Sequence, residues 1–183
     1  RKNLENYQTR NLLLIQCDLT QSIPLEKNCA DGLYSIGVLH HTSDPKISFR
    51  NLSYCLKKSG WFACHVYSQR GIYDNRKTVF YRKIFSLLKL LLGYYPPLAY
   101  SYFVSIFIRP LCNVPFFKLI SKLFVIAVPQ DRKWCLLDTF DAVTPSFQST
   151  HTAREVFDWY SENGFRNMRP TTWNFTSWTG IKK

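Results

Sequence analysis

The segment from Leu12 to Tyr67 constrains the fold most, because short apolar runs alternate in it with turn and helix signals. Apolar runs of six or seven residues occupy Leu12–Cys17, Leu33–Leu39 and Trp61–Tyr67. Runs of this length, bounded by polar or turn residues, are typical of buried strands in an α/β sheet. We therefore predict three strands here, with ligands bound beyond their carboxyl ends, as is usual in open parallel sheets.

A helix is predicted between the second and third of these runs. Asp44 is a favourable N-cap residue, and Pro45 suits the first turn of a helix. Apolar residues then recur at helical spacing as far as Leu56. We expect the helix to end at Gly60, immediately before the third strand.

The C-terminal part of the chain returns to α/β patterning. An amphipathic helix is predicted at Thr152–Asn163, where Thr152 and Glu155 have the spacing of a capping box. Two further strands, Asn167–Trp173 and Phe175–Ile181, are expected to pair in antiparallel fashion and close the sheet.

Residues 70–136 differ from both flanking parts, since their pattern is helical and unusually apolar. We therefore divide the chain into a partial α/β core at 1–69, a helical cap insertion at 70–136 and the rest of the α/β domain at 137–183. The fold class expected is α/β: an incomplete, mostly parallel Rossmann-like sheet with an antiparallel C-terminal strand and a helical insertion.

Within the cap, Leu90–Ile108 carries no charged residue over 19 positions, which is long enough to cross a bilayer. However, Pro96 and Pro97 lie near its centre and would break a helix there. A broken span would leave backbone groups unpaired in lipid. We favour helices that cap the site over a transmembrane segment, and keep an interfacial element that contacts a membrane through 79–128 as an alternative.

Composition places the protein among globular chains of one domain. Of its 183 residues, 46% are hydrophobic, which excludes a disordered chain. The six cysteines are dispersed and form no CxxC pair, which argues against a zinc site and a disulfide framework. We expect a reducing compartment, hence a cytoplasmic protein that contacts a membrane at most peripherally, and no metal site.

The net charge of +12 does not by itself indicate a nucleic-acid or membrane partner, because the basic residues are spread along the chain. A spread charge is most often a solvated surface. We therefore do not expect nucleic acid as a partner, although modification of tRNA stays open as an alternative that rests on charge alone.

In residues 12–67 the chain resembles the class I S-adenosylmethionine-dependent methyltransferases. The segment that carries the resemblance reads CDLTQSIPLEKNCADGLYSIGVLHHTSDPKISFRNLSYCLKKSGWFACHVY. The matching family pattern is a strand that ends in aspartate, a loop with proline, a second strand, a leucine-histidine-histidine turn, a helix and a third strand. Residues 152–183 resemble the last helix and two strands of the family.

The resemblance implies S-adenosylmethionine as cofactor, with four residues at its site. Asp18 matches the aspartate that accepts a hydrogen bond from the adenine amino group, and Leu19 matches the residue whose amide meets the adenine ring. Ile36 and Gly37 match the positions beside the methionine portion, where glycine permits close approach. The alternatives are a turn-capping role for Asp18 and an ordinary core strand at Ile36 and Gly37.

Three histidines are the candidate catalytic residues. His40 and His41 follow the second strand, where they could orient an acceptor or remove its proton, although they could also simply form the turn. His151 could reach the site from the cap side, whereas His65 is expected in the core. A subset of the family has a similar segment before the last helix, matched here by Asp138, Phe140, Asp141, Pro145, Gln148 and His151.

The sequence departs from the family most seriously at the glycine-rich loop. None of its seven glycines forms a GxGxG motif. The strands that carry this loop in the family are not in the sequence, so we expect a truncated methyltransferase in which Leu12–Cys17 detaches or pairs abnormally. Such a chain should bind the cofactor weakly or not at all.

Two functions follow as hypotheses. The first is methyl transfer from S-adenosylmethionine to a small acceptor, apolar or amphipathic in view of the cap. The second is a non-catalytic remnant that binds a partner or a membrane.

Overall fold

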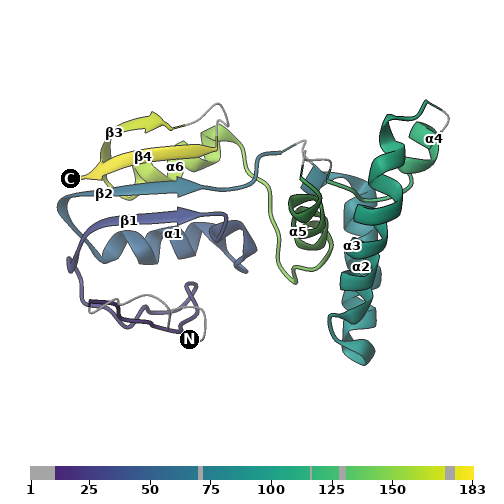
Figure 1. Ribbon diagram of the computed structural model, residues 1–183. Helices are drawn as coiled ribbons and strands as arrows, with labels where there is room; N and C mark the ends of the chain where they lie inside the picture. The colour runs from purple at the N-terminus through teal and green to yellow at the C-terminus, as the bar shows by residue number, and fades with distance from the viewer. Residues whose placement is uncertain (1–10, 70–71, 116, 128–130, 172–175) are drawn as a thin grey trace.

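The computed structural model contains a sheet with two helices and, beside it, a separate group of helices (Figure 1). The two parts meet beyond the carboxyl ends of β1 and β2 (Figure 1). The structure describes residues 11–69, 72–115, 117–127, 131–171 and 176–183.

Four strands form the sheet, in the order β1-β2-β4-β3. They are β1 (Ala30–Ile36), β2 (Leu56–His65), β3 (Phe165–Pro170) and β4 (Ser177–Lys182). β1 pairs with β2 in parallel, whereas β4 runs antiparallel to both β2 and β3. The α/β class, with closing antiparallel strands and a helical insertion, is therefore confirmed.

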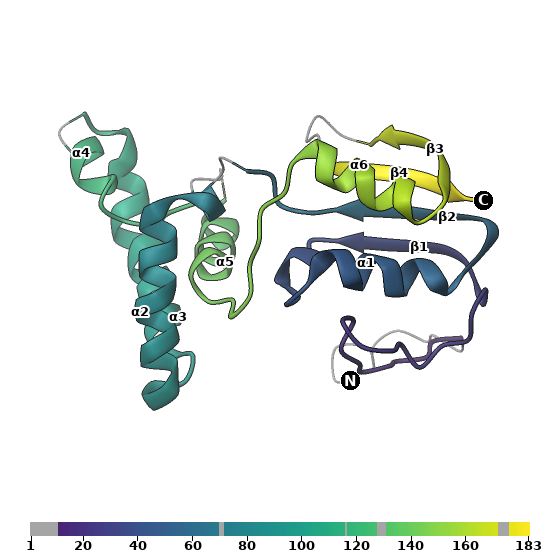
Figure 2. The same cartoon turned by 180° about the vertical axis from the view of Figure 1, so that it is seen from behind.

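Two helices cover one face of the sheet, α1 (Pro45–Tyr54) and α6 (Ala153–Glu162), and both lie in front of it in Figure 2. The core between them is aromatic: the rings of Phe49 and Phe62 stack with their centroids 4.7 Å apart. The hydroxyl of Tyr160 donates to the backbone oxygens of Phe62 and Trp178. This fully buried tyrosine therefore ties α6 to β2 and β4.

The two helix starts follow the sequence signals. The Asp44 carboxylate accepts the backbone N–H of Ile47 at 2.9 Å. At α6, Thr152 and Glu155 each accept a hydrogen bond from the other's backbone N–H, so the predicted capping box is confirmed. Each cap satisfies amide groups that the first helical turn leaves without a partner.

The predicted end of α1 is wrong. The helix ends at Tyr54 rather than at Gly60, and β2 already begins at Leu56, whose side chain is fully buried. The register with β1 shifts between the Ala30–Leu56 and Gly32–Trp61 pairs. Leu56 is buried as the first residue of β2, paired with Ala30 of β1 and followed by a bulge. This burial outweighs the helical spacing of the apolar residues, which predicted that the helix would continue.

The predicted strand at Leu12–Cys17 is also wrong. These residues form no strand, and their side chains are exposed, Leu13 by 77%. A strand needs a ladder partner for its backbone groups, and among the described residues β1 pairs only with β2. Detachment of this segment was one of the two outcomes expected.

The second predicted strand, Leu33–Leu39, is displaced toward the N-terminus. β1 ends at Ile36, and Leu39–His41 forms a short 3-10 helix, η1. Gly37 lies between them with φ +74, a left-handed conformation that ends the strand. The closing strands are antiparallel as predicted, although their observed bounds differ and residues 172–175 lie outside the described part.

The helical unit comprises helices of different length, which lie beside the sheet (Figure 1). These are α2 (Arg76–Leu92), α3 (Tyr95–Phe103), a π-helical turn η3 (Val104–Ile108), a 3-10 helix η4 (Arg109–Asn113), α4 (Phe117–Ser121) and α5 (Arg132–Val143). The predicted break is confirmed: α2 ends at Leu92, and the two prolines occupy the first turn of α3. α5 spans position 136, where the boundary of the insertion was expected.

A second apolar core holds this unit together. Phe85 of α2 packs with Val125 and with Ala142 and Val143 of α5. The side chains of Arg82 and Lys89 donate to the carbonyl groups of Ala142 and Thr144, which the end of α5 leaves free. Among the residues that the structure describes, no helix combines the length and the apolar character needed to span a bilayer.

Candidate functional site

The candidate site lies where β1 and β2 end and the helical unit begins (Figure 1). Gly37 marks the end of β1, and its N–H donates to the carbonyl of His65 at 3.2 Å. A Cβ placed on Gly37 would meet nothing within 4 Å, so the space beside this backbone is open. A positive φ beside open space permits a ligand to approach the main chain closely.

The four predicted cofactor residues are all accessible or partly accessible. Ile36 is exposed on the sheet face opposite α1 and α6, as is Tyr34. Leu19 is half-buried against the core, and its carbonyl accepts the Asn51 side chain at 2.9 Å. Asn51 therefore anchors the loop of Asp18 and Leu19 on α1.

The Asp18 carboxylate is fully exposed and bonded within its own loop. One of its oxygens accepts the backbone N–H of Thr20 at 2.9 Å and the Thr20 hydroxyl at 2.8 Å. The backbone bond, followed by the side-chain bond, lowers the pKa of Asp18 below its usual value. The local geometry is that of a turn-capping aspartate, the alternative to adenine recognition.

His40 lies in η1, and its side chain is fully buried. Its Nδ1 accepts the backbone N–H of Tyr67 at 3.3 Å, and its ring lies 3.7 Å from the Tyr67 ring. Burial, with the nearby His41, His65 and His151 adding to it, lowers the pKa of His40 to about 3. The ring is therefore neutral at physiological pH, and it packs against Tyr67 without contacting solvent.

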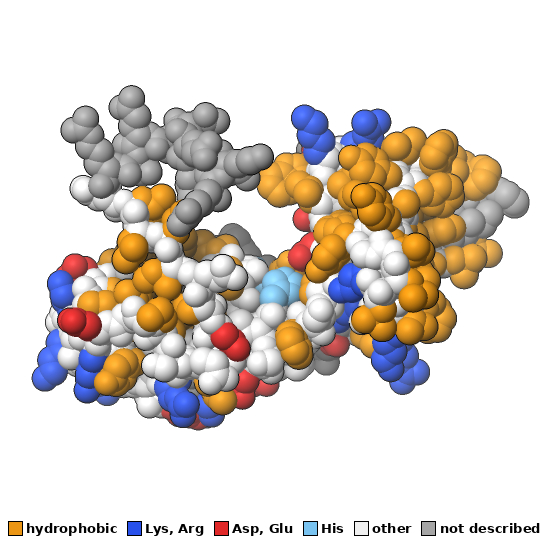
Figure 3. Space-filling view, turned by 90° about the horizontal axis from the view of Figure 1, so that it is seen from below, with side chains coloured by type: hydrophobic (Ala, Val, Ile, Leu, Met, Phe, Trp, Pro, Cys, Tyr) orange, Lys and Arg blue, Asp and Glu red, His pale blue; other side chains and the backbone are white. Residues whose placement is uncertain are grey.

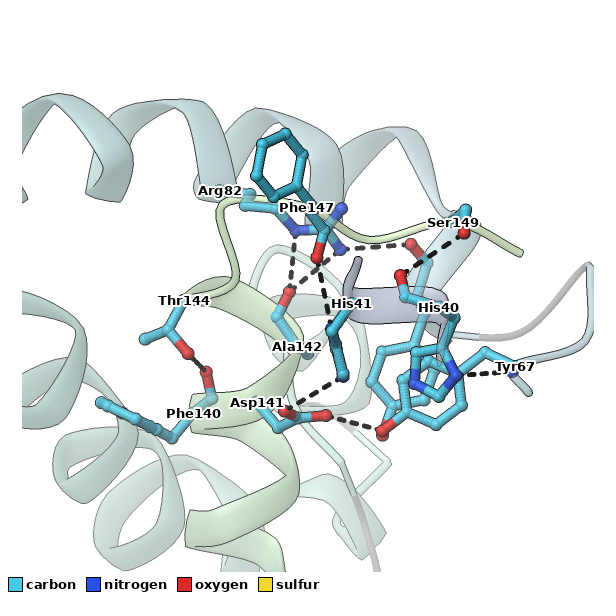
Figure 4. Close-up of polar contacts among 11 residues, drawn as sticks. His40, His41, Tyr67, Arg82, Phe140, Asp141, Ala142, Thr144, Phe147 and Ser149 are labelled. Carbon is cyan, nitrogen blue, oxygen red and sulfur yellow. Dashed lines mark hydrogen bonds and ion pairs between the residues drawn. The ribbon is translucent and has the colours of Figure 1, made fainter. Parts of the chain in front are cut away.

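His41 is partly exposed and faces the helical unit (Figure 4). Its Nδ1 lies 3.3 Å from the carbonyl of Phe147, and its Nε2 lies 3.7 Å from the carboxylate of Asp141 on α5. Both neighbours are hydrogen-bond acceptors, so a ring nitrogen that carries a proton can donate to the one it faces. Asp141 thus orients the one accessible histidine of the cluster.

Tyr67 shares the same aspartate. Its hydroxyl donates to the other oxygen of Asp141 at 2.6 Å, and its ring stacks on Tyr73 with centroids 3.8 Å apart. Burial, and then the bond to Asp141, raises the pKa of Tyr67 above its usual value. The hydroxyl therefore stays protonated and remains a donor.

His151 reaches the cluster from the loop before α6. Its Nε2 lies 2.8 Å from the Ser149 hydroxyl, and its backbone N–H donates to the carbonyl of Tyr67 at 2.8 Å. The N–H of Ser149 in turn donates to the carbonyl of His40. Burial lowers the pKa of His151, an effect that the Glu155 charge opposes.

The structure thus brings His40, His41 and His151 into one cluster, although His151 lies more than 100 positions after the other two in sequence. Sequence reasoning gave no role to Tyr67 or Ser149. Tyr67 ends the third apolar run, and Ser149 precedes His151 by two residues. Their places in the sequence, next to predicted site elements, could have identified both as candidates. His65 is half-buried beside Ser177, consistent with the structural role expected for it.

The cluster offers defined chemistry at the edge of the open space. A partly exposed imidazole, a carboxylate that holds it and a protonated phenol can orient a hydroxyl or amine and exchange a proton with it. The aromatic rings around them can pack an apolar portion of the same molecule.

A comparison with known families finds a match in the N-terminal part of the chain. Residues 1–64 match the family model described as "Methyltransferase domain". This match covers the first two predicted strands, the histidine turn and most of β2. The resemblance inferred from the sequence is confirmed over this segment.

Two solved structures show a distant likeness. One is a complex between the Haloferax volcanii Trm112 methyltransferase activator and a methyltransferase-like chain, with 9% identity and a TM-score of 0.42. The chain aligns over 90% of its own length and spans 59% of that protein. The other is the YcgJ protein from Bacillus subtilis, at 14% identity and a TM-score of 0.29, with 90% and 68% of the two chains covered. No curated protein matches the chain.

Proposed function

We propose, from the premise that residues 1–64 carry part of a methyltransferase domain, that this chain belongs to an enzyme that transfers a methyl group from S-adenosylmethionine to a small acceptor. The observation that carries the proposal is the end of β1. Gly37 adopts a left-handed conformation beside open space, and it lies three residues before the histidine cluster. A cofactor and an acceptor could therefore meet at one edge of the sheet.

The residues present fit part of this cofactor. The open backbone at Ile36 and Gly37 can accommodate its methionine portion, and the exposed Asp18 carboxylate is a suitable acceptor for the adenine amino group. The cofactor, when bound, supplies an already activated methyl group, so the protein has mainly to align the acceptor.

His41, Tyr67 and Asp141 are the side chains that we assign to the acceptor. Tyr67 can donate a hydrogen bond from its hydroxyl, and His41 can exchange a proton while Asp141 holds its ring. His40 and His151 are assigned to positioning, because both are buried and bonded to backbone groups or to Ser149. The apolar helical unit beside the cluster favours an apolar or amphipathic acceptor.

The affinity of these 183 residues for the cofactor should be low. They contain no GxGxG loop, whose backbone N–H groups would hold the cofactor closely. In addition, β1 lies at the edge of the described sheet, with Tyr34 and Ile36 exposed. An unpaired edge with exposed apolar residues is a surface that proteins normally cover.

Equilibrium binding of S-adenosylmethionine to matched glycine variants tests the proposal. Gly37→Leu places a side chain in the open space at the end of β1, and Gly93→Leu does the same at the end of α2. The two glycines both have a positive φ, 74 and 59, and open surroundings, so each substitution adds a side chain at a backbone position that favours glycine. We expect weak binding that Gly37→Leu abolishes and Gly93→Leu preserves. Equal binding by both variants, or none by the unmodified chain, would contradict the proposal.

The second candidate function is a binding module without catalysis. The missing glycine-rich loop favours it for these residues. The helical unit favours it too, because many of its large apolar side chains are exposed. Absence of cofactor binding together with a stable fold would leave this function in place of methyl transfer.

A further inference from the structure

We propose that the helical unit docks on an anionic phospholipid surface, with the outer side of α2 and the turn between α2 and α3 in contact with the lipid. This inference deepens the binding-module function proposed above and does not require cofactor binding. Three features of the helical unit support it: an apolar stripe on α2, a turn with exposed aromatic and aliphatic side chains, and a segment whose charged residues are all basic.

The stripe lies along the outer side of α2. It consists of Phe80, Ile84, Leu87 and Leu91, at positions i, i+4, i+7 and i+11, which share one face of a helix. Phe80 is 61% exposed, Leu87 66% and Leu91 82%. Opposite the stripe, Phe85 is buried in the core of the unit. The helix is therefore apolar on both sides, although only one side has a protein partner among the described residues.

The turn between α2 and α3 extends this surface. Leu90, Leu92, Tyr94 and Tyr95 are all exposed there, around Gly93. Figure 3 shows hydrophobic side chains gathered over the helical unit, with lysine and arginine at its margins. Tyrosine is enriched where a protein meets the headgroup region of a bilayer, because one end of its ring is apolar and the other polar.

The charge of this region is entirely of one sign. Residues 75–130 contain eight basic residues and no aspartate or glutamate. The basic residues are Arg76, Lys77, Arg82, Lys83, Lys89, Arg109, Lys118 and Lys122. All twelve acidic residues of the chain therefore lie outside the region. Lys83 is exposed beside the stripe, where it can reach lipid phosphate.

The basic charge of residues 75–130 indicates which kind of partner can bind this surface. A second copy of the chain would place basic residues opposite basic residues, which is unfavourable across an interface. An anionic membrane instead supplies both an apolar phase for the stripe and negative charge for the lysines. Since no described helix can cross a bilayer, the unit lies on the surface.

Co-sedimentation of residues 1–183 with vesicles tests the docking. We expect binding to vesicles of phosphatidylcholine with phosphatidylserine, and much weaker binding to phosphatidylcholine alone. Salt at about 1 M, where the screening length is about 3 Å, should release much of the bound protein. Equal binding to both lipids, or binding to neither, would overturn the proposal.

A double leucine variant and a single lysine variant locate the surface. Leu87→Ser with Leu91→Ser should weaken binding by about tenfold or more, since each change removes apolar side-chain area from the lipid contact. Lys83→Gln should weaken it by about fivefold, the equivalent of about 1 kcal/mol per basic residue near an anionic surface. All three residues are exposed, so circular dichroism should show an unchanged fold.

Matched changes outside the helical unit are the controls. Leu13→Ser removes a leucine that is 77% exposed, and Lys58→Gln removes an exposed lysine of β2. Both variants should bind vesicles as the unmodified chain does. Equal losses in the controls, or a stable dimer in sedimentation velocity that Leu91→Ser dissociates, would contradict lipid docking. Failure here leaves cofactor binding at Gly37 unaffected, so the two proposals are tested separately.

Discussion

The hydroxyl of Tyr67 donates to the Asp141 carboxylate at 2.6 Å and thereby joins the end of the sheet to α5 of the helical unit. The same carboxylate lies 3.7 Å from His41, so one acidic residue organises two donors. The contact makes the site part of the junction between the two parts of the molecule.

Tyr67→Phe should lower the free energy of unfolding by roughly 1.5 to 3 kcal/mol, because it removes a hydrogen bond to a charged acceptor and leaves the carboxylate without that donor. Urea unfolding measures the loss. Tyr54→Phe, at an exposed tyrosine of α1, is the control and should leave stability nearly unchanged. A loss no larger than that of the control would show that the junction does not depend on this bond.

His40 should make the fold sensitive to acid. Its pKa is lowered to about 3 in the folded state, against about 6.5 for an unperturbed histidine. Between these values the unfolded chain binds more protons, so stability is full above about pH 6.5 and falls as the pH drops toward 3. The slope contributed by one proton is about 1.4 kcal/mol per pH unit.

His40→Asn should reduce this slope by up to one proton, measured by denaturant unfolding at a series of pH values. His65 and His151 have pKa values lowered by burial and contribute with the same sign, so a slope remains. A slope unchanged by His40→Asn would contradict the neutral, buried state of this ring.

The close packing of β4 against α6 predicts a contrast between two glycines. A Cβ on Gly180 would lie 2.9 Å from the Tyr160 ring, which is fully buried and bonded at its hydroxyl. Gly180→Ala should therefore cost roughly 1 to 3 kcal/mol by overpacking. The three atoms nearest to a Cβ on Gly32 would all belong to the side chain of Trp61, which is half-exposed and can turn away.

Gly32→Ala should accordingly have a much smaller effect than Gly180→Ala. Thermal unfolding of the two variants side by side makes the comparison. Equal destabilisation by both would contradict this contrast. It would mean that the Tyr160 ring can shift, or that the Trp61 side chain cannot.

The sequence predicted the elements whose signals are local. The capping box of Thr152 and Glu155, the break before Pro96 and the antiparallel closing strands all depend on residues near one another. The strand at Leu12–Cys17 could not be judged in this way, because a strand exists only with a partner. Helical spacing also misplaced the end of α1, since burial of Leu56 beside β1 is a tertiary effect.

Only part of the candidate site was predicted, because some of its contacts join residues far apart in the sequence. His40, His41 and His151 came from a family resemblance and converge in the structure, and their roles remain a proposal. The bonds from Tyr67 to Asp141 and from Ser149 to His151 were not foreseen. The first joins residues 74 positions apart, and no local pattern encodes it.

The central claim is that a cofactor site lies at the end of β1, and amide chemical shifts of the isotope-labelled chain test it most directly. Titration with S-adenosylmethionine should shift the amide signals of Gly37, Val38 and Leu39, and that of Leu19. Signals of α2 and α3 should stay in place. Shifts confined to the helical unit, or no shift at saturating cofactor, would contradict the account.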